Sequence, residues 1–404
     1  MKKALSILLA LVLVFALFAC GKTAENPPAA TPPAGENNTP AADPGTDADT
    51  PSNADTPPAS GEALVGSDEW YAADTYDHFD REPYKIAYIC NLLSWAFNKS
   101  ISDSLEALGK KLNYTYTAFA ANNDYDAYIN QIYTFYDQGY DAFVIGADDD
   151  LAPRAYEVCK ELGVPFIAES TAFIDDDGNN LYSGVVQAQY KNGETCAQWL
   201  IDNYKNYWAD PIDTSKLGLI VLDYSVILGI HEREVGARET FLAAFPEAEA
   251  NYIWGDLVAL ADIGFSAQGG NQLTTSILTA HPEVEKWFIV ANVDDWAMGA
   301  TRAVEALHME DRVLISSVQA DAFLTEMTAG YAGDVYVSAA AVSSVGFSKL
   351  MAANLVTILE GRATAETIWA DWIPAGSEYP LVEITGEIIT RDTYQEYLTK
   401  QVIS

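Results

Sequence analysis

Two aromatic side chains, Trp95 and Phe97, lie in an expected loop, although solvent-exposed loops usually carry polar residues. The loop follows an apolar run at 86–90 with the length and branching of a buried parallel strand. After it, an amphipathic helix is indicated by the spacing of Ile101, Leu105, Leu108 and Leu112. In such a unit the loop lies at the carboxyl end of the sheet, where open α/β folds bind their ligands. The two side chains could therefore form a platform under the ring of a small ligand. Alternatively, they cap the hydrophobic core, and this stretch supports both interpretations equally.

Residues for covalent or metal chemistry do not come together in the sequence. No Gly-x-Ser-x-Gly, HExxH or GxxxxGK[ST] pattern occurs, and no GxGxxG opens the first helix. The run DDDGNN at 175–180 resembles part of a calcium loop, but its glycine is misplaced and its closing acid would fall on Val186, so we expect a surface turn. The histidines lie apart, without metal-ligand spacing, at His78, His231, His281 and His308. Missing motifs alone do not exclude an enzyme, but we expect no catalytic residue, no cofactor and no metal.

The composition limits the partners of the chain. Its 404 residues allow two or three ordinary domains, and its net charge is −36. Such an acidic excess argues against nucleic acid and against anionic lipid surfaces as partners. The charge indicates nothing specific about a small ligand, because all of it could be solvated surface.

The first twenty residues form a secretion signal. Lys2 and Lys3 are its positive end, and the apolar stretch 4–18 is too short for a settled transmembrane helix. The end of this stretch resembles the bacterial lipoprotein signal, in which a small residue precedes a lipid-modified cysteine, although Phe18 is larger than usual. This resemblance implies that Cys20 is acylated and tethers the protein to the outer face of the cytoplasmic membrane. The alternative is an ordinary secreted protein in which Cys20 is incidental.

Residues 21–61 are rich in Pro, Ala, Thr, Asn and Asp and have hardly any large apolar side chains. Such a segment cannot bury enough surface to order itself, so we expect a flexible spacer. Residues 62–83 form an acidic, aromatic lead-in whose place the sequence does not fix. The cysteines beyond Cys20 are expected to be buried thiols rather than a disulfide framework: Cys90, Cys159 and Cys196.

From residue 84 onward the pattern alternates between strand and helix. Repeated βαβ alternation predicts parallel sheets covered on both faces, and so many strands favour two consecutive doubly wound domains of the α/β class. The strand candidates are the runs 86–90, 114–119, 142–145, 166–168, 182–186, 217–222, 250–253, 287–290 and 313–317.

From about residue 85 to the C-terminus the chain resembles the periplasmic sugar-binding proteins of bacterial ABC importers, which include ribose-, galactose- and arabinose-binding members. The resemblance rests on the joint order of several blocks, each weak by itself. The blocks nearest to the arabinose-binding member are ANVDDWAMGA at 291–300 and IITRD at 388–392. Other blocks are NND at 122–124, GYDAFVI at 139–145, GVPFI at 163–167, EREVG at 232–236 and HPEV at 281–284.

The family fold implies two lobes, joined by three crossings, that close on a ligand held between them. Carried over, the N-terminal lobe comprises residues 84–187 plus a return segment at 339–368. The C-terminal lobe comprises 188–338 plus the tail 371–404. Small residues at 338–341 suit a crossing, because hinges absorb backbone rotation at a few positions.

The resemblance also implies ligand contacts, through aromatic faces and planar polar groups in a mostly dry cleft. Carboxylates of the arabinose-binding member are replaced here by Ser170 and Thr171, with Glu169 alongside, while Ala188 and Val293 replace an Asp and an Asn of the family pattern. These departures put the identity of the sugar in doubt. The residues implied as contacts are Asn91, Trp95, Phe97, Ser170, Thr171, Gln187, Gln189, Arg233, Asn292, Asp294 and Gln319.

Together these features predict a lipid-anchored, extracytoplasmic solute-binding protein of an ABC importer that captures a monosaccharide. Its expected partners are the small sugar and a membrane permease, and we expect a monomer that binds no nucleic acid. Two alternatives stay open: a receptor that presents its ligand to a chemotaxis or sensor-kinase system, and a secreted α/β enzyme acting on a sugar.

Overall fold

The computed structural model describes residues 63–208 and 211–403. The signal sequence expected at 1–20, the lipidation expected at Cys20 and the spacer expected at 21–61 lie outside these residues. Within the described part of the chain, no helix is long and apolar enough to cross a membrane.

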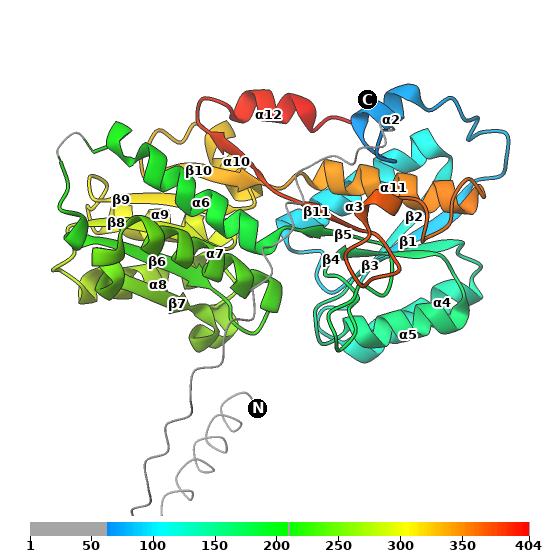
Figure 1. The fold of residues 1–404 in the computed structure, drawn as a ribbon, viewed down its shortest axis with the longest axis horizontal. Coiled ribbons are helices and arrows are strands. Elements are labelled where there is room, and N and C mark those ends of the chain that lie inside the picture. The colour runs from blue at the N-terminus through cyan, green and yellow to red at the C-terminus, as the bar shows by residue number, and fades with distance from the viewer. Residues whose placement is uncertain (1–62, 209–210, 404) are drawn as a thin grey trace, which may run out of the picture. The chain divides into compact units, whose positions relative to one another are not determined.

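The first sheet has six parallel strands in the order β11-β5-β4-β3-β1-β2. Its strands are β1 (Tyr84–Cys90), β2 (Tyr114–Ala120), β3 (Ala142–Gly146), β4 (Phe166–Ser170), β5 (Gly184–Gln187) and β11 (Leu381–Ile384). One face packs on α3 (Ala96–Leu112) and α11 (Ser344–Leu359), and the other on α4 (Tyr125–Asp137) and α5 (Ala152–Leu162). Figure 1 shows these two helical layers on opposite sides of the sheet.

The second sheet also has six strands, in the order β12-β10-β9-β8-β6-β7, and only β12 is antiparallel to its neighbour. Its strands are β6 (Leu217–Asp223), β7 (Tyr252–Asp256), β8 (Lys286–Ala291), β9 (Val313–Val318), β10 (Tyr336–Ala341) and β12 (Glu387–Thr390). The helices of this half are α6 (Gln189–Asn203), α7 (Leu228–Ala244), α8 (Ala267–Ala280), α9 (Asp294–Ala306), α10 (Asp321–Thr328) and α12 (Tyr394–Lys400). The first two cover one face of the sheet, and α8 and α9 cover the other.

The local sequence explains these elements. β6 is buried along its whole length, as a central parallel strand with helices on both faces must be. The apolar stripe of α3 faces the sheet, and α5 is capped at its C-terminus by Gly163, whose φ of 65° is left-handed and favours glycine. The predicted α/β architecture of two doubly wound sheets is therefore confirmed.

Short 3₁₀ segments lie at Tyr204–Asn206, Thr214–Lys216, Pro246–Asn251, Leu257–Ile263 and Ala370–Trp372.

The strand pairings differ from the expected division of the chain in two places. Residues 339–341 end β10 and pair in the second sheet, so the return to the first half begins only at α11. Residues 381–384, expected in the C-terminal lobe, form β11 and pair with β5 in the first sheet. The reason is packing: Val382 is buried in the core under α3 and α11, and β11 continues the sheet beyond β5.

The lead-in packs on the first half of the chain. Its short helix α2 (Asp68–Ala73) places Tyr71, which donates a hydrogen bond to the carbonyl oxygen of Lys349 on α11 at 3.1 Å. The carboxylate of Glu360, fully buried at the end of α11, accepts from His78 Nδ1 at 2.7 Å and from Arg81 Nη2 at 3.0 Å. The lead-in is therefore part of the first half of the structure.

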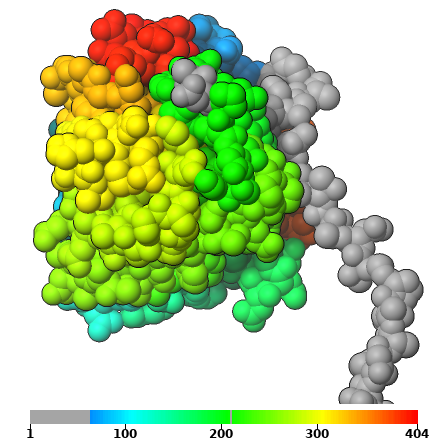
Figure 2. Space-filling model, turned by 90° about the vertical axis from the view of Figure 1, so that its left-hand side faces the viewer, coloured from blue at the N-terminus to red at the C-terminus, as the bar shows by residue number. Residues whose placement is uncertain are grey.

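Residues 387–400 lie on the second half, whereas Ile403 packs against the core of the first half. Arg391 Nη1 binds Asp334 Oδ1 at 3.2 Å, and Lys400 Nζ binds Glu387 at 3.1 Å. Figure 2 shows the red C-terminal segment next to an orange segment of the second half.

Candidate functional site

Several candidate residues lie at the carboxyl ends of parallel strands. Asn91 follows β1, Ser170 and Gln187 end β4 and β5, Asn292 follows β8, and Gln319 follows β9. The carboxyl edge of an open α/β sheet is where ligands bind, because the loops there diverge. The two sheets thus each present a candidate edge.

Arg233, on α7, is hydrogen-bonded to three of the other candidate residues. It is 3% exposed, and its guanidinium donates from Nε to Gln189 Oε1 at 2.7 Å and from Nη2 to Gln187 Oε1 at 2.8 Å. Its Nη1 donates to the carbonyl oxygen of Asn292. Burial lowers the pKa of Arg233 to about 10. The guanidinium has five N–H donors, so one on each terminal nitrogen is left over for a further acceptor.

Asn292 is completely buried, and its side chain turns toward Asp223. Its Nδ2 donates to Asp223 Oδ1 and to the carbonyl oxygen of Ile230, both at 3.0 Å. Among the described residues, its Oδ1 has no hydrogen-bond partner. The other oxygen of Asp223 accepts from His231 Nδ1 at 2.7 Å and from Trp254 Nε1 at 2.9 Å. This buried carboxylate therefore fixes the loop that carries Asn292.

Asp294 is also buried, at the start of α9, and binds protein rather than open solvent. Its Oδ2 accepts from the backbone N–H of Ala322 at 2.6 Å, in the first turn of α10. Burial first, and then the charge of Asp321, raise the pKa of Asp294 to about 8. Asp321 in turn accepts from Ser100 Oγ at 3.2 Å.

On the first sheet, Asn91 is engaged by its neighbours. Its Nδ2 donates to Asn123 Oδ1 at 2.8 Å and to Asp148 Oδ2 at 3.3 Å, and its Oδ1 accepts from the backbone N–H of Asn123 at 2.7 Å. Asp148 also accepts from Tyr125 Oη at 2.6 Å. This network closes the carboxyl ends of β1 and β3 and lies apart from the hydrogen bonds of Arg233.

Glu169 points into the protein instead of compensating at the edge. It is 2% exposed, and its carboxylate accepts from Tyr88 Oη at 3.1 Å and from Ser170 Oγ. Burial raises its pKa. Ser170 has a left-handed φ of 64°, and its hydroxyl is turned toward Glu169, whereas Thr171 is half-buried. Ser170 and Thr171 were both expected to offer hydroxyl groups to the ligand. The hydroxyl group of Ser170 is instead hydrogen-bonded to Glu169.

The two aromatic candidates separate in the structure. Trp95, the residue before α3, stacks on Phe265, with ring centroids 4.5 Å apart and planes inclined by 13°. Phe97 is 5% exposed and packs edge-on against Phe347 in the core under α3 and α11. The platform role expected for Phe97 is therefore corrected: its position on the inward side of α3 makes it a core residue.

Gln319 completes the set. It is half-buried, has a left-handed φ of 68°, and its backbone N–H donates to the carbonyl oxygen of Ala340 at 2.9 Å. The structure thus gathers Gln187, Gln189 and Asn292 around Arg233, and it places Asn91, Ser170 and Phe97 in separate environments.

Sequence reasoning missed three residues that shape this region: Asp223, His231 and Phe265. Asp223 could have been found from the sequence. It is the acidic residue that ends the apolar run 217–223, so it lies at the carboxyl end of a buried strand. In the sequence, His231 shows neither metal-ligand spacing nor any other local signal, and the same is true of Phe265. Within residues 63–208 and 211–403, no group of three or more His, Cys, Asp or Glu side chains is arranged to hold a metal ion. As predicted, Cys90, Cys159 and Cys196 are buried and unpaired.

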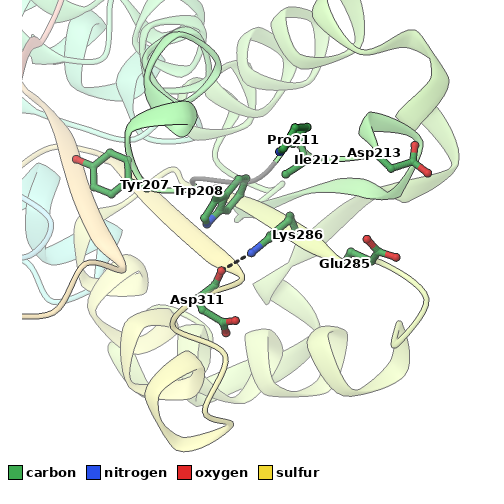
Figure 3. Close-up of a pocket in the computed structure, with 8 residues that line it drawn as sticks. All are labelled: Tyr207, Trp208, Pro211, Ile212, Asp213, Glu285, Lys286 and Asp311. Atoms are coloured by element: carbon green, nitrogen blue, oxygen red, sulfur yellow. Dashed lines mark hydrogen bonds between the residues drawn. The ribbon is translucent and has the colours of Figure 1, made fainter.

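A pocket of about 360 Å³ lies elsewhere, where β6 and β8 begin. Lys286 lies over the ring of Trp208 at 5.2 Å and donates to the carbonyl oxygen of Asp311 at 2.6 Å (Figure 3). Open α/β sheets bind ligands at the carboxyl edge, and this pocket is at the amino edge. It contains no residue of the candidate site. Its lining residues are Tyr207, Trp208, Pro211, Ile212, Asp213, Glu285, Lys286 and Asp311.

The fold and this site can be compared with those of known proteins. Residues 86–363 match the model of the periplasmic binding protein domain, and the chain belongs to that family of extracytoplasmic proteins. A curated relative is the L-arabinose-binding periplasmic protein of an ABC transporter from Azospirillum brasilense. It is 24% identical over 323 residues, which are 78% of this chain and 88% of the relative.

Solved structures support the same fold. The periplasmic binding protein of the arabinose ABC transporter from Shewanella sp. ANA-3, bound to α- and β-L-arabinofuranose, has a TM-score of 0.58 and 19% identity, covering 78% of this chain and 95% of that one. A solute-binding protein from Actinobacillus succinogenes 130z with bound D-allose also has a TM-score of 0.58, with 17% identity, covering 78% and 100%. The chain is thus a periplasmic binding protein, and the solved structures share its fold.

Proposed function

We propose that this protein captures a monosaccharide between the carboxyl edges of its two sheets and delivers it to the permease of an ABC importer. The observation that carries the proposal is the environment of Arg233. Its buried guanidinium brings together Gln187 from the first sheet with Gln189 and Asn292 from the second half, and it keeps donors for sugar oxygens. Planar amide and guanidinium groups in a dry site suit the hydroxyl groups of a sugar.

The mechanism is capture without chemistry. A ligand that contacts both halves binds the closed form more tightly than the open form, and it shifts the equilibrium by that difference in affinity. Capture at about 1 μM corresponds to roughly −8 kcal/mol. We further propose that the protein acts as a monomer held to the membrane by acylated Cys20.

L-arabinose is the first ligand to test, because the curated relative carries it in its name and two solved neighbours are named for arabinose. We expect it, or a related pentose or hexose, to raise the melting temperature in a thermal-unfolding panel that also includes D-allose, D-ribose, amino acids and nucleosides. Isothermal titration calorimetry then gives the dissociation constant. A response to a nucleoside or an amino acid alone would refute the choice of sugar, and a silent panel would refute capture of these ligands altogether.

The anchor is tested separately in cells. Cys20→Ala should move the protein from the membrane fraction to the soluble extracytoplasmic fraction, while a matched Cys159→Ala change should leave it with the membrane. Membrane retention of the Cys20 variant would contradict the lipid anchor.

A further inference from the structure

The first link between the two sheets is held at both of its ends by one side chain. β5 ends at Gln187 and α6 begins at Gln189, so Ala188 alone joins a strand of the first sheet to a helix of the second half. Arg233 donates from Nη2 to Gln187 Oε1 at 2.8 Å and from Nε to Gln189 Oε1 at 2.7 Å. A rotation of the backbone at Ala188 moves these two acceptors relative to each other, and it must therefore strain or break this clamp.

A second link runs beside the first. It joins β11 to β12 through residues 385–386. The backbone N–H of Ala188 donates to the carbonyl oxygen of Ile384 at 3.0 Å, and that of Gly386 donates to Asn192 Oδ1 at 2.7 Å. Asn192 is completely buried on α6. The first two links are thus hydrogen-bonded to each other and respond together.

Gly386 shows how closely this second link is packed. A Cβ atom there would lie 2.7 Å from the carbonyl carbon of Ala340, which is near the end of β10. Backbone atoms cannot give way as a flexible side chain can. Because the third link leaves β10 just beyond Ala340, all three links meet within one small region around the start of α6.

Arg233 also reaches the candidate ligand loop. Its Nη1 donates to the carbonyl oxygen of Asn292, which lies in the loop between β8 and α9. Asn292 is held by Asp223 through its side chain, so this loop is fixed on one side and bonded to Arg233 on the other. A ligand that engages the loop or the guanidinium must therefore alter the geometry of the clamp.

The acceptors of this clamp are neutral. Among the described residues, all three hydrogen bonds of Arg233 end on amide or peptide oxygens and none on a carboxylate. Hydrogen bonds from a charged donor are strong, but neutral acceptors hold a buried cation less firmly than a carboxylate would. The clamp can thus exchange one acceptor for a ligand oxygen without separating an ion pair.

We propose that Arg233 is a positioning residue that couples the ligand loop to the links between the sheets, and that it sets the balance of open and closed forms through Gln187 and Gln189. The ligand side of this coupling rests on the proposed function. The clamp itself acts in the ligand-free protein as well, so it can be tested without any sugar.

The test uses a double-mutant cycle on the full chain. Gln189→Leu removes one acceptor, whereas Gln189→Glu converts it into a charged partner of nearly the same shape. Spin labels at Tyr133→Cys on α4 and Thr279→Cys on α8, two exposed positions, report the open-to-closed ratio from their distance distribution, in a Cys20→Ser background. We expect the two Gln189 changes to move the ratio in opposite directions, each by about threefold or more, as contacting residues couple.

The same two changes in an Arg233→Lys background should move the ratio by much less, because lysine lacks the fork that binds both acceptors. Gln198→Leu, at an exposed position on the same helix, is the matched control and should leave the ratio unchanged. An unchanged ratio in both Gln189 variants, or equal shifts with and without Arg233, overturns the coupling. Gln189→Glu keeps the test usable if the leucine variant fails to fold. A protein that passes this test but binds no sugar refutes the proposed function alone.

Discussion

The rings of Trp95 and Phe265 lie face to face, with centroids 4.5 Å apart, although 170 positions separate them in the chain. Trp95 precedes the first helix of the first sheet, and Phe265 precedes α8 of the second half. Phe265 also contacts Tyr224 at 5.2 Å and Trp296 at 5.2 Å, so an aromatic cluster of the second half supports it. The stacked pair therefore stabilises only those conformations in which the two halves meet.

Replacing Phe265 by alanine should weaken ligand binding without unfolding the protein. An aromatic pair contributes about 0.5–1.5 kcal/mol beyond the area it buries, so the dissociation constant should rise by roughly two- to twelvefold. Calorimetric titration with the sugar identified in the panel measures this change. Tyr133→Ala, at an exposed aromatic position on α4, is the control and should bind normally. Unaltered affinity of the Phe265 variant would show that the stack does not contribute to closure.

Phe97→Ala should act on stability instead. Phe97 is buried against Phe347, and removing a buried phenylalanine side chain costs about 3–5 kcal/mol through lost transfer energy and the cavity left behind. Chemical denaturation measures the loss, and the affinity of the protein that remains folded should change little. A large loss of affinity with normal stability would restore the platform role that the sequence suggested.

Asp294 should make stability depend on pH. Its pKa is about 8 in the folded protein and near 4 in the unfolded chain. Between these values the folded protein binds a proton that the unfolded chain has released, so the contribution of this group to the free energy of unfolding falls as the pH rises from about 4 through 8. Asparagine keeps an oxygen for the N–H of Ala322 but cannot ionise. When the pH rises from 5 to 8, the free energy of unfolding of the Asp294→Asn variant should therefore fall less than that of the unaltered protein.

Thermal unfolding at the two pH values checks this expectation. Asp137→Asn, at an exposed position at the end of α4, should leave the pH dependence unchanged. If Asp294→Asn keeps the same difference in melting temperature between pH 5 and pH 8, then Asp294 is ionised throughout and the assignment is wrong.

Glu360→Ala should destabilise the protein by about 1–3 kcal/mol, because it leaves three hydrogen-bonding partners without the buried carboxylate that accepts from them. Those partners are His78 and Arg81 of the lead-in, together with Arg362, which binds Glu360 at 2.9 Å. The matched change Glu387→Ala removes an exposed pair with Lys400 and should cost only about 0–1 kcal/mol. Equal effects of the two substitutions on the melting temperature would argue against a structural role for the lead-in.

The sequence predicted the strands that are buried on both faces, because runs such as β6 carry their own signal in apolar and β-branched residues. It could not assign β11, since Leu381–Ile384 and Glu387–Thr390 are equally short and only tertiary pairing sends them to different sheets. Phe97 carried a usable signal: it lies four residues before Ile101 and so extends the apolar stripe of α3.

The candidate site was less predictable than the fold. Arg233, Gln187, Gln189 and Asn292 were named from resemblance, and their convergence depends on how α7 packs against α6. No local pattern shows that Glu169 turns inward to Tyr88, or that Phe265 meets Trp95, because such contacts depend on distant segments of the chain.

The docking of residues 63–83 has a mechanical consequence. This segment precedes the part that matches the family, yet it is bonded to Lys349 and Glu360 of the first half. In the proposed tethered protein, the spacer would thus pull on the first half alone. The first half would be anchored to the membrane, and the second half would rotate relative to it when the protein closes. Neither the length of the tether nor a force along it would then oppose the rotation of the second half toward the first.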